Sequence, residues 1–418
     1  MIHDYREGVV VIGAGVAGLS AARSLAAHAI PVTLIEAAER IGGRAWTTRP
    51  ALLGGTPFDH GATWLHAAHR NPLVNLAQPG DDLRDSDAAR RERIFVGDRL
   101  ATDEQVRAYE RAWDRLEALV APALAGPDTS LAAAMAPMAD EFWAPTVALW
   151  EGAIIAAADA DVLSLQDWRR NALDGRNLQP AAGIGAFVEA RLAAPAALGT
   201  HATLIDWSGP GVSVETNRGT IRAAAAIVTV STGVLAAGAI QFRPVLPDLV
   251  EAAIHRLPMG LLSKVAIPAP DPAAFGLTAD TLLLRAGGQM TFDAWPSGRP
   301  YVTGFMGGAL AWSLAERPAE AAALARDELG RMLGGRWSEQ ALPTEWGTDP
   351  LHRGAYAYAR PGDVSARGNL AGAFPAERLL FAGEAYRTDG LAGTVAGAFL
   401  SGAEAAAKLA AARRPPLS

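Results

Sequence analysis

The first pattern with chemical meaning is a glycine-rich turn near the start of the chain. Gly13, Gly15 and Gly18 form a G-x-G-x-x-G pattern, which directly follows the four β-branched residues 9–12. A turn of this kind between a buried strand and a helix brings backbone amides and the positive helix N-terminus to a pyrophosphate. Glu36 ends the next apolar strand, where a carboxylate accepts both hydroxyls of a ribose. We therefore predict a dinucleotide site, and NADP is not expected because the acid disfavours a 2′-phosphate.

A lysine inside an apolar segment is the next candidate. Lys264 is the single charge in residues 261–267, and lysines are rarely buried unless they are paired or functional. A cation held in a dry site stabilises negative charge that develops on a reacting group. We predict that Lys264 is catalytic. The alternative is a lysine at a strand edge that faces solvent.

Two later segments would serve the same ligand. Residues 379–384 have the pattern of a buried strand and end in Gly383 and Glu384, at the edge where parallel sheets bind ligands. The turn 393–395 opens a helix of small residues, and the free amides at its positive end favour negative charge. A purely structural helix cap is the alternative for this turn.

Hydrophobic periodicity predicts the elements that position these residues. Expected helices cover residues 19–29, 102–120, 142–158, 164–171, 182–192, 318–333 and 394–411. Expected strands cover residues 9–12, 32–35, 212–216, 220–222, 226–230, 261–267, 281–284, 301–306 and 379–384. The strands at 212–216 and 220–222 are expected to form a hairpin, and those between 261 and 306 a mixed sheet.

Composition narrows the class of protein. The chain has 418 residues, half of them hydrophobic, which suffices for a large core and two or three compact units. The net charge of −7 argues against nucleic acid as a partner and fits a cationic substrate. The absence of cysteine excludes disulfides, Cys-ligated zinc and cysteinyl attachment of a cofactor, and no metal site is expected. Without an export signal or 18 consecutive apolar residues, we expect no membrane span and a cytoplasmic protein.

Taken in order, the motifs resemble those of the flavin-containing amine oxidases. The motifs are G-x-G-x-x-G with Glu36, R-x-G-G-R ending at Arg44, G-A-T-W at 61–64, Lys264-Val265, W-x-x-D-P from Trp346, and G-E with G-T-V-x-G-A within 383–398. They span almost the whole chain. G-A-T-W-L-H, which ends at His66, and G-A-Y-A-Y at 354–358 are similar to the polyamine and spermine oxidase branch.

The resemblance implies an α/β fold with a Rossmann-like FAD-binding domain, p-hydroxybenzoate-hydroxylase-like in architecture, and a discontinuous α+β substrate domain. The FAD-binding domain would comprise residues 1–71, 193–243 and 371–418. The substrate-binding domain, with a helical cap and a mixed sheet, would comprise residues 72–192 and 244–370. FAD should be non-covalent, because Ala355 stands where some relatives attach it through cysteine.

The resemblance also implies roles for individual residues. Arg44 would neutralise the FAD pyrophosphate, and Glu384 would accept hydrogen bonds from ribityl hydroxyls. The turn 393–395 would face the flavin N1 and C2=O, and Lys264 would reach the flavin N5 through a water. The expected cofactor-binding residues are Gly13, Gly15, Val16, Ala17, Gly18, Glu36, Ala37, Arg44, Gly61, Ala62, Thr63, Trp64, Ala202, Trp346, Gly383, Glu384, Gly393, Thr394 and Val395.

The expected substrate-binding residues are His66, Tyr356 and Thr394. By resemblance His66 faces the substrate amine and Tyr356 flanks it; judged without the resemblance, His66 would more commonly be a structural polar residue. The monoamine oxidases carry a second tyrosine at the position of Thr394, so a two-sided aromatic cage would need Trp295 or Tyr386 as a substitute. This departure favours a polyamine-type pocket.

The expected reaction removes a hydride from the carbon α to an amine and transfers it to the flavin. Water then hydrolyses the imine, and O2 reoxidises the flavin to give H2O2, so the partners are a small-molecule amine and O2. Four alternatives stay open: a monoamine oxidase, a flavin desaturase, a non-enzymatic FAD-binding module, and an L-amino-acid oxidase. The last would bind a carboxylate through an arginine such as Arg84, Arg93 or Arg176. The sequence does not fix the oligomeric state.

Overall fold

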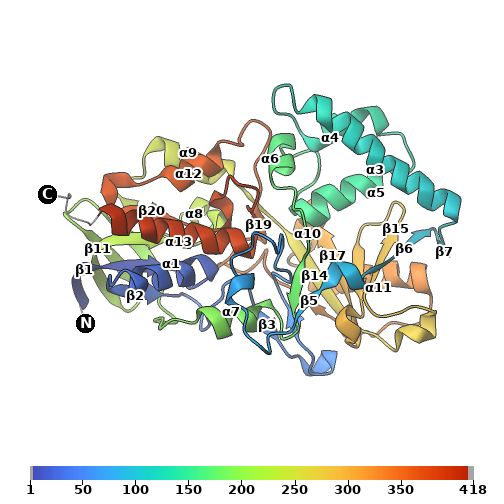
Figure 1. Cartoon of the computed structure of the whole chain (residues 1–418), viewed down its shortest axis with the longest axis horizontal. Coiled ribbons are helices and arrows are strands. Elements are labelled where there is room, and N and C mark those ends of the chain that lie inside the picture. Colours follow the sequence, from blue (N-terminus) through green and yellow to red (C-terminus); the bar gives the residue numbers. More distant parts are fainter. Residues whose placement is uncertain (1–2, 413–418) are drawn as a thin grey trace.

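The computed structural model describes residues 3–412, and it shows two halves side by side (Figure 1). The first half contains the strands β1 (His3–Ile12), β2 (Val32–Ile35), β9 (Ala202–Asp206), β10 (Val212–Thr216), β11 (Gly219–Val228), β12 (Gln241–Arg243) and β20 (Leu379–Phe381). They form one sheet in the order β12-β9-β10-β11-β1-β2, with β20 paired to β11. Within it, β20, β11, β1 and β2 are parallel, as expected for a ligand-binding sheet edge.

Both faces of this sheet are covered. Val9 and Val11 of β1 pack with α1 (Val16–Ala27) and α13 (Val395–Ala412), whereas Val10 and Ile12 point to the opposite core. That alternation follows from the two-residue period of a strand. The helix α1 begins directly after the glycine turn, so the turn lies at the carboxyl end of β1.

The second half contains the strands β6 (Arg91–Val96), β7 (Arg99–Leu100), β14 (Leu262–Pro268), β15 (Thr281–Arg285), β16 (Thr291–Ala294), β17 (Tyr301–Gly307) and β18 (Leu342–Pro343). Their order is β18-β14-β17-β16-β15-β6-β7. One face, with Val265, Phe292 and Met306, packs against α11 (Pro318–Leu333). The opposite face carries a row of directly paired residues, Lys264, Phe305 and Thr291.

A helical cap lies over this second sheet and contains α3 (Asp103–Ala123), α4 (Leu131–Met135), α5 (Ala144–Ala148) and α6 (Leu165–Arg170). The predicted helix at 142–158 is only partly correct. The short α5 continues into a π-helix, Leu149–Ala156, which ends at Ala157 with φ of 57°. Single helical turns of this wider kind occur often at functional sites.

Several predicted elements are confirmed. The strand at 32–35 and the helix at 318–333 have the predicted bounds, and the hairpin pairs Thr216 with Gly219. The strand predicted at 226–230 is instead the end of β11, because the second hairpin strand continues without a break into the parallel sheet.

The domain limits stay a prediction. Two helices that those limits assign to the substrate domain contribute buried residues to the cores of the parallel sheet, and so does a third helix that the limit at 370 divides. The first two are α7 (Ile184–Leu192) and α9 (Asp248–Arg256), and the third is α12 (Ala366–Gly372).

Among residues 3–412, α13 is the one helix long and apolar enough to cross a membrane by length and composition alone. Core helices pass the same test. Its apolar composition is explained by packing, because Gly402 lies against the backbone of Ala17 in α1. The expected absence of a membrane span stays a prediction.

The close crossing of α1 and α13 predicts a stability effect. In Gly402→Ala the new Cβ would overlap the Ala17 carbonyl, which is backbone, so we expect a loss of about 1–3 kcal/mol in the free energy of unfolding. The matched control is Gly330→Ala in α11, where a Cβ meets no atom within 4 Å and helix propensity improves. Thermal unfolding should give a lower Tm for the first variant and an equal or higher Tm for the second. Equal Tm shifts in both variants would contradict this packing argument.

Candidate active site

One cavity of about 810 Å³ lies between the two halves and collects the predicted site residues. Every residue predicted to bind cofactor or substrate lines it except Gly18, and Lys264 lines it as well. Gly18 instead faces the backbone of Gly13, where a Cβ would overlap the carbonyl. Its task is helix-to-strand packing, and the roles of the other residues stay predictions.

The glycine turn has the geometry of a dinucleotide cradle. Gly13 has a φ of 102°, which favours glycine. At the end of β2, the Glu36 carboxylate accepts hydrogen bonds from the amides of Ala14 (2.6 Å) and Ala38 (2.8 Å). The acid is therefore fixed beside the turn, at the carboxyl edge of the sheet.

Arg44 and Glu384 contact each other rather than standing apart. Arg44 Nη1 donates to Glu384 Oε1 (3.0 Å) and to the carbonyl of Ala355 (2.6 Å). Oε1 also accepts from the amide of Ala357, whereas Glu384 Oε2 is buried without a hydrogen-bond partner among the described residues. A buried carboxylate oxygen without a donor is costly, and a hydroxyl of a ribityl chain would satisfy it. The residues thus fit a flavin dinucleotide.

Lys264 is buried and fully hydrogen-bonded. Its Nζ donates to the carbonyls of Asp59 (2.8 Å) and Gly61 (2.6 Å) and to Thr63 Oγ1 (2.6 Å). Burial lowers the pKa of Lys264 to about 8, although Asp59 and Asp293 act in the opposite direction. An ammonium has three N–H donors, so a group in the cavity would have to compete with Thr63, the one side-chain acceptor.

His66 belongs to a chain of polar side chains that the sequence did not indicate. Its Nδ1 lies 2.8 Å from Asn177 Oδ1, and Asn177 Nδ2 donates to Asp87 Oδ2 (2.9 Å). Because Asp87 fixes the orientation of the amide, Nδ1 of His66 must be the donor. Burial lowers the pKa of His66, against the opposing effects of Asn177 and Asp87. The imidazole is therefore neutral at pH 7, with an acceptor at Nε2.

Tyr356 is anchored through its hydroxyl. The hydroxyl donates to the carbonyls of Ile155 (2.9 Å) and Ile154 (3.4 Å) at the end of the π-helix. A Cβ placed on Gly393 would lie 3.5 Å from the Tyr356 ring. The tyrosine therefore presents its ring to the cavity beside the turn at 393–395.

The hydroxyl of Thr394 serves as a helix cap. It donates to the carbonyl of Leu391 (2.7 Å) and accepts from the amide of Gly397 (2.9 Å) in the first turn of α13. Trp295 and Tyr386, considered as substitutes for a second aromatic wall, are buried in the protein cores and do not line the cavity. Neither residue therefore supplies a second aromatic wall, and the structure has no substitute at these two positions for the missing tyrosine.

Two further acids line the cavity, Asp293 and Glu151, and the sequence did not indicate either of them. The side-chain carboxylate of Asp293, two residues from Thr291 on the sheet, accepts no hydrogen bond and forms no ion pair among residues 3–412. Burial and Asp280 raise its pKa to about 6, against Arg90, Lys264 and Arg299. Glu151 of the π-helix accepts from Trp168 Nε1 (2.8 Å), and burial raises its pKa.

The cavity is lined by both acidic and basic side chains. The glycine turn, the fixed carboxylates and the buried lysine lie around one cavity, an arrangement that fits a dinucleotide beside a substrate. The chain belongs to the flavin-containing amine oxidoreductase family, whose family model matches residues 16–410. It is therefore a flavin-containing amine oxidase.

Individual relatives agree with this family. Polyamine oxidase 4 of Oryza sativa subsp. japonica is 30% identical over 95% of this chain and 87% of the relative. Lysine-specific histone demethylase 1 homolog 2 of Arabidopsis thaliana is 27% identical over 96% of this chain and 58% of the relative. A structure of putrescine oxidase bound to putrescine has a TM-score of 0.78 at 21% identity, covering 98% of this chain and 100% of that one; this likeness concerns the fold alone.

The hydrogen bonds of Lys264 predict a selective effect of Lys264→Met. Loss of the buried cation should slow reoxidation of the reduced flavin by O2 roughly 100-fold, because negative charge develops on oxygen, and flavin reduction by amine by less than tenfold. Stopped-flow measurement of both half-reactions checks this. The control is Lys408→Met, at the exposed lysine of α13. Equal slowing of both half-reactions by Lys264→Met would remove the catalytic role of Lys264.

The polar chain predicts an effect of Asn177→Leu. Without the amide, His66 loses the partner that fixes its Nε2 as an acceptor, so flavin reduction should slow about tenfold, the rate equivalent of one hydrogen bond. Asn75→Leu, at an exposed asparagine outside the cavity, should have no effect. Anaerobic reduction kinetics measure both variants. An unchanged rate in Asn177→Leu would show that the tautomer of His66 does not matter.

Proposed function

We propose that this protein is an FAD-dependent oxidase of amines that carry a second positive charge, as polyamines do. The observation that supports it best is Asp293, a half-buried carboxylate that lines the cavity and accepts no hydrogen bond from residues 3–412. A carboxylate partly removed from water gains from a cationic partner, and an ammonium group of the substrate would supply it. Glu151 offers a second carboxylate on the cap side of the same cavity.

The cofactor is proposed to be FAD, bound without a covalent link in a Rossmann-like domain. Glu36 would hold the ribose, Arg44 would contribute positive charge to the pyrophosphate, and Glu384 Oε2 would accept from the ribityl chain. The parallel sheet and its glycine turn support this assignment. When bound, FAD accepts the hydride from the substrate and passes electrons to O2.

The protein residues orient the amine and select its protonation state. His66 Nε2, a neutral acceptor, would bind an N–H of the amine whose α carbon is oxidised, and Tyr356 would pack beside it. Only a neutral amine has the lone pair that assists hydride loss. Asp293 would bind the distant ammonium, so one end of the substrate stays charged while the other is neutral. Water would then hydrolyse the imine.

The alternatives have less support. An L-amino-acid oxidase needs an arginine for the carboxylate, but Arg84, Arg93 and Arg176 do not line the cavity. Instead, Arg84 lies 4.0 Å from Asp82, and Arg176 lies 3.5 Å from Asp85. Arg90 and Arg169 do line the cavity, and each already lies within 4.0 Å of an acid, Asp87 and Glu117 respectively. A desaturase of carbon–carbon bonds would have no use for an amine-accepting imidazole or for carboxylates that await a cation.

The direct test is anaerobic mixing of the purified protein with polyamines, monoamines and L-amino acids. Bleaching of the flavin absorption should be fastest with spermine, spermidine or an acetylated polyamine. Aerobic turnover of the same amines should release H2O2. Fastest bleaching by monoamines or amino acids would leave the family assignment intact and contradict the proposed substrate class.

The carboxylate of Asp293 predicts a pH-dependent effect of Asp293→Asn. Asp293 is ionised above its pKa of about 6, so at pH 8 the variant should bind a diamine at least tenfold more weakly than the wild type. The ratio of the apparent Kd of the variant to that of the wild type should approach one as the pH falls to 5, because the wild-type carboxyl group then becomes neutral too. Anaerobic reduction at several amine concentrations gives the apparent Kd at each pH.

The matched control for Asp293→Asn is Glu92→Gln. Glu92 lies on the same sheet, in register with Leu282, which pairs with Asp293, and it does not line the cavity. For Glu92→Gln, the apparent Kd relative to the wild type should stay near one at every pH. A ratio for Asp293→Asn that does not change with pH would exclude Asp293 as the cation-binding group.

A further inference from the structure

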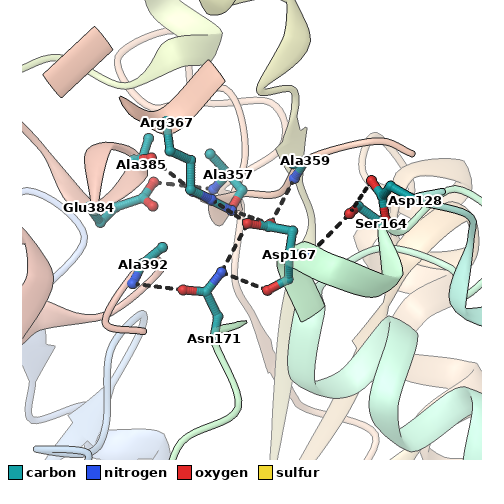
Figure 2. A network of polar contacts seen from close by, with 10 residues as sticks. All are labelled: Asp128, Ser164, Asp167, Asn171, Ala357, Ala359, Arg367, Glu384, Ala385 and Ala392. Atoms are coloured by element: carbon teal, nitrogen blue, oxygen red, sulfur yellow. Dashed lines mark hydrogen bonds and ion pairs between the residues drawn. The ribbon is translucent and has the colours of Figure 1, made fainter. Parts of the chain in front are cut away.

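A buried ion pair joins the helical cap to the first half of the molecule. Asp167 of α6 and Arg367 of α12 face each other with side chains 3% and 2% exposed. Arg367 Nε donates to Asp167 Oδ1 and Nη2 to Oδ2, both at 2.7 Å, in the bidentate arrangement that Figure 2 shows. Both residues line the cavity, and none of the proposed chemistry uses them.

The remaining bonds of the pair go to the chain around Tyr356. Arg367 Nη2 donates to the carbonyl of Ala357 (3.1 Å), and Asp167 Oδ2 accepts from the amide of Ala359 (3.1 Å). Arg367 Nη1 donates to the carbonyl of Ala385 (2.8 Å), the residue that follows Glu384 in the chain. The pair thus fixes the backbone that follows the substrate-facing tyrosine and the backbone beside the ribityl-binding acid.

A branch of the same network reaches the turn that closes the flavin end of the site. Asn171 Nδ2 donates to Asp167 Oδ1 (3.0 Å), and Asn171 Oδ1 accepts from the amide of Ala392 (3.3 Å), directly before Gly393 (Figure 2). Gly393 in turn lies against the Tyr356 ring. One carboxylate therefore connects both segments that meet at the tyrosine.

The opposite end of α6 serves the cap side of the cavity. Ser164 caps the helix by accepting from the amide of Asp167 (3.0 Å), and its hydroxyl donates to Asp128 (2.7 Å). Trp168, which follows Asp167 in the helix, donates its indole N–H to Glu151. A short, capped helix thus positions the Asp167 carboxylate and the partner of a cavity acid together.

Stability alone does not explain such a pair. Burial raises the pKa of Asp167, but the hydrogen bond and charge of Arg367 outweigh it, so the pKa is lowered overall and the acid stays ionised. Desolvation of two charges offsets most of their attraction, and well-packed apolar side chains are often as stable. What an apolar pair cannot supply is the set of directional bonds to two backbone segments and, through Asn171, to a third.

We propose that Asp167 and Arg367 are positioning residues for hydride transfer, which hold Tyr356 and the turn at 393–395 in register with the cap. The inference rests on the proposed function for the identity of the reaction. Misplacement of such a wall by about 1 Å is enough to slow a reaction roughly 100-fold. The half-reaction with O2, which depends on Lys264 on the other sheet, should not change.

The test is the double variant Asp167→Leu with Arg367→Met, which removes both charges together and keeps the volume. We expect a folded protein that retains FAD, with flavin reduction by amine slowed at least 30-fold and reoxidation by O2 within twofold of the wild type. The visible circular dichroism of the bound flavin should also change, because the segments beside its ring lose their fixed position. Each single variant leaves one buried charge unpaired and should lower the Tm.

The matched control is Arg285→Met with Glu328→Leu, which removes another bidentate pair away from the cavity. Its Glu328 is buried, its Arg285 is half-buried, and its bonds are 2.6 to 2.9 Å long. The control variant should leave both half-reactions and the circular dichroism unchanged. Equal slowing of reduction and reoxidation, or an unchanged spectrum and reduction rate in the first double variant, would overturn the positioning role. If no polyamine reduces the wild-type flavin, the proposed function fails, whereas the circular dichroism still tests the pair.

Discussion

The geometry of the site depends on the three hydrogen bonds of the buried Lys264 ammonium. The lysine comes from β14 in the mixed sheet of the second half and donates all three protons to the segment 59–63. Because each acceptor lies on that one segment, the lysine holds the segment, most of which lines the cavity, against β14. Removing a buried donor from such a set leaves acceptors unsatisfied, so this residue has a structural role as well as the proposed chemical one.

Around this cation, burial sets the protonation states. The same desolvation that lowers the pKa of Lys264 and of His66 raises the pKa of Asp293 and of Glu151. The cavity thus contains a neutral imidazole and carboxylates that gain from a cationic ligand. This combination suits an amine that is neutral at one nitrogen and charged at another.

The sequence predicted the periodic elements well and the irregular ones poorly. The helix at 318–333 was found because its apolar residues recur at helical spacing. The π-helix at 149–156 was not distinguished from an α-helix, since its wider turn depends on contacts with distant segments, such as the bond from Tyr356 to Ile155. Asn177 and Asp87 were missed for a similar reason: nothing in their spacing marks them as partners of His66.

What the sequence determined by itself is the dinucleotide turn, the acid at Glu36, the lone charge of Lys264 and the family to which their order belongs. These are local signals, set by backbone geometry and by the cost of burying charge. Only the tertiary structure decided which acids line the cavity and that Asp167 meets Arg367, 200 residues apart. Such contacts depend on how two sheets and a cap pack together, and no short-range pattern in the chain encodes that packing.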